Sequence, residues 1–404
     1  MFLSKYKHGI FAGMLFATVV LTSCNKEPEQ IPGTGGPTVT SGATLGDTLR
    51  NIASDSLYYR LILKARMEGM LTSRSNYYTL FVPDNNAMKQ FINAASGGQV
   101  PLNAPDAVFS GFINNFITLQ NARAIVSYNI IPQMVPAFSF PATFPNMQYP
   151  TIFNPAPQLS SFFRLTGFIS SRNGFYINNI PIVAPDLIAA NGVIHGIPAI
   201  NLPPSQYLWD RISSDADLTL LKAVIERADS AGPALVPALQ NIGANFTVFA
   251  PTNSAVKQLI SNLSGGQIPV AAPDAVFINF IGSNFLSTFL ANVVVAYHVL
   301  DGRNVTNKPG LLVERPGRAY LNNFPTSGQL FKTLLNYDST ASVHPGVQLQ
   351  ATFTGPIVSA ATVRGWGNSS ASNVLIDPTP STGSSDQQYL NGTIHKIDQV
   401  LLPQ

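Results

Sequence analysis

Residues 391–397 read Asn-Gly-Thr-Ile-His-Lys-Ile, and residues 191–197 read Asn-Gly-Val-Ile-His-Gly-Ile. An Asp stands five residues before each Asn, at Asp186 and Asp386, and each stretch runs into an apolar segment that ends in Leu-Pro. Two near-identical stretches in the same order with their surroundings indicate an internal duplication. We therefore interpret the chain as a tandem repeat in which each copy marks the end of a domain.

The local chemistry of the two stretches predicts a tight turn followed by a strand. Asn-Gly tolerates the positive φ that tight turns require, and the residues after it alternate as in a half-buried strand. Ile194 and Ile394 are expected to point into the core. The alternation then places His195 and His395 on the opposite face, and the sequence does not decide whether that face meets solvent.

A second stretch also occurs once in each domain, and it is predicted to supply that domain's first strand. Residues 79–87 read Thr-Leu-Phe-Val-Pro-Asp-Asn-Asn-Ala, and residues 247–255 read Thr-Val-Phe-Ala-Pro-Thr-Asn-Ser-Ala. Each is predicted to be a short apolar strand that ends at a proline, followed by a helix capped by Asp, Asn or Thr. The matching spacing continues through residues 97–109 and 265–277, which strengthens the case for duplication.

Each domain is expected to open with a helix, because apolar residues recur there at helical spacing behind Ser or Asp caps. The caps are Ser54 and Asp55 in the first domain and Ser213 and Ser214 in the second. The apolar positions are Leu57, Leu61 and Ala65, then Leu218, Leu221, Ile225 and Ala228.

The second domain is longer than the first by about 31 residues, because the spacing between equivalent stretches grows towards its C-terminal end. We expect the extra residues in loops near 301–346 and 363–386, where Gly, Ser, Asn and Pro are dense. Such loops are expected to decorate the surface.

The first 24 residues have the pattern of a secretory signal: Lys5 and Lys7 precede an apolar run from Ile10 to Leu21, which is too short to span a bilayer. The run ends in Leu-Thr-Ser-Cys and resembles a bacterial lipobox, which would make Cys24 the lipidated first residue of the mature chain. A generic signal peptide with an incidental Cys is the alternative. Residues 25–43 are predicted to be a flexible tether, because they are rich in Gly, Pro and Thr.

Composition excludes several classes of protein. The 23 Lys and Arg residues nearly balance the 20 Asp and Glu residues, which argues against a nucleic-acid partner. Cys24 is the only cysteine, so no intramolecular disulfide can form. At 404 residues and 45% hydrophobic content, the chain can bury two cores.

The ordered stretches resemble the fasciclin domain family. The matching features are the Thr-x-Phe-x-Pro-x-Asn box, a Tyr-His box, the Asp-x-x-x-x-Asn-Gly-x-Ile-His box and the terminal Leu-Pro. The resemblance covers residues 44–204 and 205–404, which we predict to be two fasciclin-like domains. It implies an α+β fold, each domain a β wedge of two packed sheets with several helices, and a role in adhesion or matrix attachment without catalysis.

The resemblance also draws attention to family-motif residues. Tyr297 and His298 match the Tyr-His box, whereas Tyr128 is followed by Asn129. In some animal members the region around this pair is implicated in receptor binding, and Asn129 puts that role in doubt here. We expect a structural role for this pair, in which the aromatic ring packs and the polar group ties down the backbone.

Motifs of catalysis are missing from the sequence. The histidines after the signal segment show no zinc-site spacing, and there is no nucleophile elbow, phosphate loop or dinucleotide fingerprint, so we expect no metal, no cofactor and no enzyme. A scattered Ser-His-Asp site is the remaining enzyme alternative. Trp366 lies between two glycines and is the candidate ligand contact, with burial beneath the insertion as its alternative.

These observations predict a non-catalytic envelope lipoprotein that binds an envelope or matrix protein or a polysaccharide. We expect it on the outer membrane, held only by its lipid and facing the cell exterior, with the periplasmic leaflet as the alternative. The competing function is an accessory glycan-binding or protein-binding lipoprotein of an outer-membrane nutrient uptake complex.

Overall fold

The computed structural model describes residues 41–142, 146–230, 235–283, 286–301, 318–335, 346–380 and 382–404. These residues belong to one compact unit, Val39–Gln404. Cys24, the predicted signal segment and most of the predicted tether lie outside the described residues. In the part of the chain that the structure describes, no helix has the length and hydrophobicity to cross a membrane.

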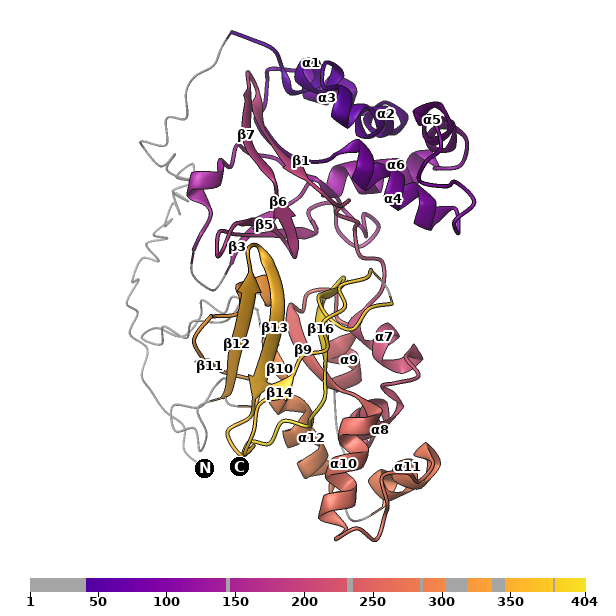
Figure 1. Ribbon diagram of the computed structural model, residues 1–404, viewed down its shortest axis with the longest axis vertical. Coiled ribbons are helices and arrows are strands. Elements are labelled where there is room, and N and C mark those ends of the chain that lie inside the picture. Colours follow the sequence, from indigo (N-terminus) through magenta and orange to yellow (C-terminus); the bar gives the residue numbers. More distant parts are fainter. Residues whose placement is uncertain are drawn as a thin grey trace, which may run out of the picture. The chain divides into compact units, whose positions relative to one another are not determined.

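The first repeat, residues 44–204, combines helices with two four-stranded sheets (Figure 1). Its sheets have the strand orders β2-β1-β8-β7 and β3-β4-β5-β6. Its helices are α1 (Leu45–Arg50), η1 (Ala53–Asp55), α2 (Ser56–Ala65), α3 (Glu68–Thr72), α4 (Asn85–Ala95), α5 (Asp106–Asn115), α6 (Leu119–Tyr128) and η2 (Ala137–Ser139). Its strands are β1 (Tyr78–Pro83), β2 (Ile130–Ile131), β3 (Met147–Pro150), β4 (Thr166–Ser170), β5 (Phe175–Ile177), β6 (Ile180–Ile182), β7 (Ala184–Ala189) and β8 (Gly192–Ile197).

The second repeat, residues 205–404, follows the same plan, with sheets of strand orders β10-β9-β16-β15 and β11-β12-β13-β14. Its helices are α7 (Leu208–Ser214), α8 (Thr219–Asp229), α9 (Leu235–Leu239), α10 (Asn253–Leu263), α11 (Asp274–Gly282), α12 (Thr288–Tyr297) and η3 (Leu321–Asn323). Its strands are β9 (Phe246–Pro251), β10 (Val299–Asp301), β11 (Gln329–Phe331), β12 (Val347–Thr354), β13 (Ile357–Arg364), β14 (Ser372–Asn373), β15 (Gln387–Tyr389) and β16 (Gly392–Ile397).

The predicted α+β class is confirmed. Each sheet and each large hydrophobic cluster draws its residues from one repeat. The division of the chain at residues 204 and 205 stays a prediction.

A parallel strand pair forms the centre of each repeat. The predicted strand near the start of the repeat pairs with the Asn-Gly strand at its end, with Leu80 opposite Ile194 and Val248 opposite Ile394. Ile194 packs with the helices, whereas His195 on the next position packs against the ring of Phe81. The predicted alternation is confirmed, and the face that carries the histidine is buried beneath the second sheet.

The predicted caps of the helices that follow β1 and β9 are confirmed. Asp84 accepts a hydrogen bond from Ala87 N at 2.7 Å, and Thr252 accepts one from Ala255 N at 3.2 Å. Such side chains satisfy backbone N–H groups that have no partner within the helix.

The predicted caps of the opening helices are wrong. Ser213 and Ser214 lie inside α7, and Asp55 precedes α2 without a capping bond from its side chain. The N–H groups are instead capped across the fold: Asn85 Oδ1 accepts from Leu57 N at 2.9 Å, and Asn253 Oδ1 accepts from Leu220 N at 3.0 Å. Both Asn residues close the Thr-x-Phe-x-Pro-x-Asn box.

Part of the extra length of the second repeat lies between the two ranges in which we expected it. Strands β12 and β13 have eight residues each, whereas their counterparts β4 and β5 have five and three. The tip of this longer hairpin contacts the first repeat, because Tyr176 Oη donates a hydrogen bond to Pro356 O. The hairpin is therefore not a mere surface decoration. Residues 302–317 and 336–345 lie outside the described residues.

Replacing Gly392 with Ala tests the parallel pair. A Cβ at this position would lie 2.5 Å from Phe246 O on the neighbouring strand and 2.6 Å from a methyl group of Leu208. We expect Gly392→Ala to lower the free energy of unfolding by roughly 3 kcal/mol, because backbone cannot move aside without breaking the strand pairing. Urea denaturation followed by circular dichroism measures this.

Gly111→Ala is the matched control, because a Cβ there meets no atom within 4 Å inside α5. It should gain roughly 0.5–1 kcal/mol from helix propensity. Equal effects of the two substitutions would contradict the close approach of β9 and β16.

Candidate functional site

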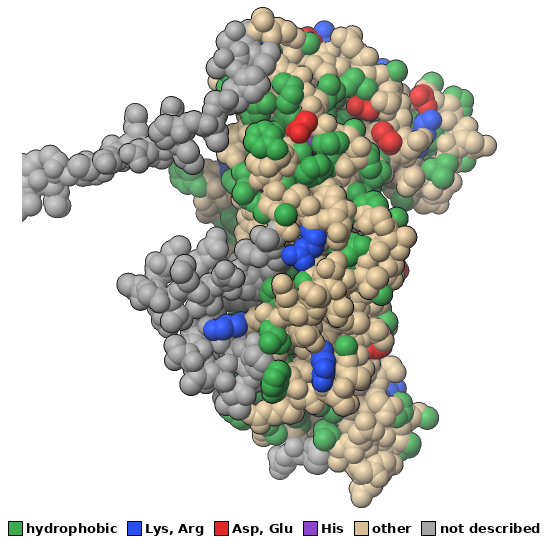
Figure 2. All heavy atoms as spheres, turned by 60° about the vertical axis from the view of Figure 1, so that its left-hand side comes forward, with side chains coloured by type: hydrophobic (Ala, Val, Ile, Leu, Met, Phe, Trp, Pro, Cys, Tyr) green, Lys and Arg blue, Asp and Glu red, His purple; other side chains and the backbone are tan. Residues whose placement is uncertain are grey.

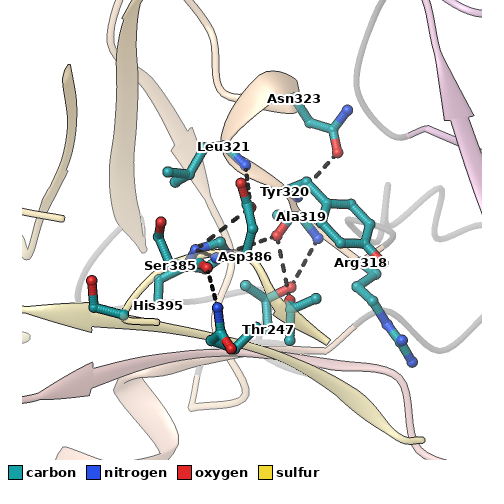
Figure 3. A network of polar contacts seen from close by, with 12 residues as sticks. Thr247, Arg318, Ala319, Tyr320, Leu321, Asn323, Ser385, Asp386 and His395 are labelled. Atoms are coloured by element: carbon teal, nitrogen blue, oxygen red, sulfur yellow. Dashed lines mark hydrogen bonds and ion pairs between the residues drawn. The ribbon is translucent and has the colours of Figure 1, made fainter. Parts of the chain in front are cut away.

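A buried polar network surrounds His395 (Figure 3). Its Nδ1 accepts a hydrogen bond from the backbone N–H of Asp386 at 3.1 Å. Its Nε2 lies 2.9 Å from Ala319 O, to which it donates, so the neutral ring carries its proton on Nε2. Burial lowers the pKa of His395 to about 4. The imidazole thus joins two backbone segments as a neutral group.

Asp386 and Thr247 complete the network. Asp386 has a left-handed backbone, with φ of 51°, and its Oδ1 accepts from Leu321 N at 2.9 Å. Thr247 Oγ1 accepts from Ala319 N at 2.9 Å. Burial raises the pKa of Asp386 to about 7. Together these side chains hold the segment that enters η3 against the central strands.

The first repeat contains the same network. His195 Nδ1 accepts from Asp186 N at 3.2 Å, and its Nε2 lies 3.0 Å from Val135 O. Asp186 Oδ1 accepts from Ala137 N at 2.9 Å, and Thr79 Oγ1 accepts from Val135 N at 2.8 Å. Both nitrogens of each buried histidine are occupied by backbone groups, so this arrangement serves the fold.

The residue after the tyrosine of the Tyr-His box, Asn129 in the first repeat and His298 in the second, is also buried. Asn129 Nδ2 donates to Ile125 O and to Asn201 O, each at 2.8 Å. His298 Nδ1 lies 2.7 Å from Val294 O, and its Nε2 accepts from Leu401 N at 2.8 Å. Both residues therefore fasten the end of a helix to the C-terminal segment of their repeat. Burial lowers the pKa of His298 to about 4.

The tyrosines of this box have different partners in the two repeats. Tyr297 Oη donates to Gly346 O at 2.6 Å and accepts from Trp366 N at 2.9 Å. Tyr128 Oη accepts from Asn178 Nδ2 at 3.3 Å and from Gln388 Nε2 of the second repeat. Tyr128 thus takes part in the contact between the repeats.

Trp366 is exposed, with 58% of its surface accessible. No side chain fits at the glycines on either side. A Cβ on Gly365 would lie 2.6 Å from Leu402 O, and one on Gly367 would lie 2.1 Å from Gln404 C. The backbone on both sides of Trp366 therefore lies against the C-terminal segment. Its role as a ligand contact stays a prediction.

Polar side chains join the two repeats. Asn146 Nδ2 donates to Asn323 Oδ1 at 2.9 Å and to Arg318 O at 2.7 Å. Ser170 Oγ accepts from Asn322 Nδ2 at 3.3 Å and from Asn323 Nδ2 at 3.0 Å. Sequence reasoning missed these residues, because they belong to no repeated box.

A groove of about 1800 Å³ is lined by both repeats and by the connecting residues 199–206. Of its described lining residues, only Arg123 and Asp386 belong to charged types. Among the amides that line it are Gln120, Asn121, Asn154, Asn201, Gln387 and Gln388. Its aromatic lining includes Phe91, Phe112, Phe116, Phe153 and Tyr176.

The groove's chemistry suits a neutral ligand. Amides present both donors and acceptors, and aromatic rings offer apolar faces. On the face shown in Figure 2, charged side chains are likewise sparse among hydrophobic and uncharged polar ones. Among the described residues, no cluster of three or more His, Cys, Asp or Glu side chains could hold a metal ion.

The pKa shifts predict how acid affects stability. His298 has a folded pKa of about 4, below its ordinary value near 6.5, so between these values the unfolded chain binds a proton that the folded chain does not. This group's contribution to stability is complete above pH 6.5 and is lost as the pH falls towards 4. Asp386 acts in the opposite direction, because its folded pKa of about 7 makes the folded chain bind the extra proton.

We expect His298→Asn to lower the free energy of unfolding at pH 7.5 by roughly 1–3 kcal/mol, because buried backbone groups lose their partner. Between pH 6.5 and 4.5, the free energy of unfolding of this variant should fall less steeply than that of the wild type. The two slopes should differ by about 1.4 kcal/mol per pH unit. The free energy of unfolding of Asp386→Asn should fall more steeply with falling pH than that of the wild type. Urea denaturation at several pH values measures all three slopes, and unchanged slopes in both variants would contradict the assigned protonation states.

A solved structure of a FAS1 domain pair from the insect cell adhesion molecule fasciclin I is similar at 13% identity, with 86% of this chain and 97% of that chain covered and a TM-score of 0.32. No curated protein matches the chain. Residues 55–203, which make up most of the first repeat, match the family model described as the fasciclin domain.

Proposed function

We propose that the protein is a non-catalytic adhesion protein of the cell envelope, and that it holds an uncharged polysaccharide of a matrix or a cell surface in the groove between its repeats. The fasciclin match of residues 55–203 supports a role in adhesion or binding. The internal duplication supports a second domain of the same kind. The single observation that carries the proposal is the groove's nearly uncharged lining of amides and aromatic rings.

Phe116 is the most accessible aromatic contact of the groove. Its side chain is 72% exposed and stacks on Phe112, with ring centroids 5.2 Å apart. An exposed ring with a packed neighbour presents a fixed apolar face, against which the C–H groups of a sugar ring can pack. Gln120 and Asn121 lie in the same lining and offer partners for hydroxyl groups.

We expect Phe116→Ala to weaken binding of a neutral polysaccharide by roughly tenfold, because about 1–2 kcal/mol of ring contact is lost. Phe289→Ala is the matched control: Phe289 is 73% exposed on α12 of the second repeat and lies outside the groove. Glycan-array binding by the purified chain measures both. Equal losses in the two variants, or none in either, would contradict the groove proposal.

The competing function is an accessory binding lipoprotein of an outer-membrane nutrient uptake complex. The exposed ring of Trp366, which lies outside the groove, is the observation that favours it. Loss of glycan binding in Trp366→Ala but not in Phe116→Ala, with co-purification of a transporter, would favour this function over adhesion.

The proposed location is the outer membrane, through a lipid on Cys24. The support is the sequence of the first 24 residues, in which a charged start and a short apolar run precede the only cysteine of the chain. A lipid anchor of two or more acyl chains gives stable attachment without any membrane affinity of the folded domains. Exposure on the cell surface is part of the proposal.

Cys24→Ala is expected to move the protein from the membrane fraction to the soluble fraction, because acyl chains can no longer attach. Immunoblotting of fractionated cells measures this, with Cys24→Ser as a second variant that keeps the size of the side chain. A variant that stays with the membranes would refute the lipid anchor. Protease digestion of intact cells carrying the unaltered protein tests exposure on the surface.

A further inference from the structure

Arg318 is a buried cation for which no described residue supplies an anionic partner. Only 6% of the residue is exposed, and it has no carboxylate partner among the residues that the structure describes. Its Nε donates to Asn245 Oδ1 at 3.0 Å, and its two terminal nitrogens donate to Tyr389 O at 3.0 Å and to Leu390 O at 3.4 Å. These acceptors are neutral, and within the described part of the chain no carboxylate balances the charge of the guanidinium.

The guanidinium faces a small pocket. Figure 3 shows that the Arg318 side chain points away from the network around His395. It lies over the ring of Phe168, with 4.9 Å from its Cζ to the ring centroid. Both residues line a pocket of about 240 Å³, to which the first repeat contributes a second arginine, Arg164. Arg164 is exposed, so it stands at the pocket's outer side.

The lining of this pocket has no acidic residue among those described. Its other described side chains include the ring of Phe163 and the amides of Gln148 and Asn245. Two guanidinium groups without a carboxylate attract an anion, and their planar donors match the two oxygens of a carboxylate. Rings and amides suit the apolar face and the hydroxyl groups of a sugar. The volume fits one monosaccharide better than a chain of them.

We propose that this pocket binds the carboxylate of a sugar acid, with Arg318 as the inner contact and Arg164 as the outer one. The guanidinium of Arg318 is already oriented by three hydrogen bonds and by the Phe168 ring, so little side-chain entropy is lost on binding. The bound anion supplies a charge partner that none of the described residues provides. This site is separate from the groove, whose lining includes neither arginine.

The test uses the purified full-length chain and isothermal titration calorimetry with glucuronate at constant ionic strength. Glucose has the same ring without the carboxylate, and acetate has the carboxylate without the ring. We expect glucuronate to bind more tightly than either. Arg164→Gln should weaken glucuronate binding by roughly tenfold, because one charged hydrogen bond is lost.

Arg318→Lys keeps the charge but loses the planar fork, and it should weaken binding by at least about tenfold. Because Arg318 also supports the backbone of the second repeat, Arg164→Gln is the decisive variant. Arg60→Gln, on the exposed side of α2 and outside both pockets, is the control and should bind as the wild type does.

Equal binding of glucuronate and glucose would overturn the carboxylate assignment, and equal binding of glucuronate and acetate would overturn the sugar. Identical affinities of Arg164→Gln and Arg60→Gln would overturn the site. Phe116→Ala should leave glucuronate binding unchanged, so that failure of the groove proposal and failure of this one can be told apart.

Discussion

The parallel pairing of the first core strand with the last is the contact on which each repeat depends. It joins β1 to β8 and β9 to β16, segments more than a hundred residues apart in the chain. The Asn that precedes each last strand extends this contact to the helices. Asn191 Oδ1 accepts from Leu45 N at 2.7 Å, and Asn391 Oδ1 accepts from Leu208 N at 3.0 Å. The end of each repeat thus caps the helix at its beginning.

Burial on both faces of that strand pair explains the polar residues of the repeated boxes. A strand covered on one side by helices and on the other by a second sheet cannot expose its histidine to water. The ring must therefore stay neutral and find backbone partners, which the Asp N–H and a loop carbonyl provide. The left-handed backbone of Asp186 and Asp386 places their N–H groups for this purpose.

The groove and the arginine pocket exist because the two repeats differ from one another. The histidine network holds η2 in the first repeat, which contains the exposed Phe138. In the second repeat it holds η3, in which Asn322 and Asn323 donate hydrogen bonds to Ser170 of the first repeat. The longer β12–β13 hairpin adds a further contact. Both the groove and the arginine pocket are lined by residues from the two repeats, so each depends on these unequal features.

Sequence alone determined the duplication, the strands that run from Thr79 and Thr247 to a proline, the helices after them and the faces on which Ile194 and His195 lie. The strands, helices and faces follow from local periodicity and proline positions, and the duplication follows from repeated spacing. The α+β class was implied by the resemblance to the fasciclin family. The sequence also led us to expect that the polar residue after each tyrosine, Asn129 or His298, ties down a backbone group, and both side chains are buried.

Tertiary structure alone decided which side chains cap α2 and α8. Asn85 and Asn253 reach them from the first residues of α4 and α10, whereas local rules pointed to nearby serines and an aspartate. It also decided that both faces of the central strands are buried and that the Tyr128 hydroxyl meets Gln388 of the other repeat. Arg318 was one of many arginines in the sequence. Packing of the two repeats buried its charge, and no carboxylate among the described residues pairs with it. No local pattern encodes this, because the contacts join segments far apart in the sequence.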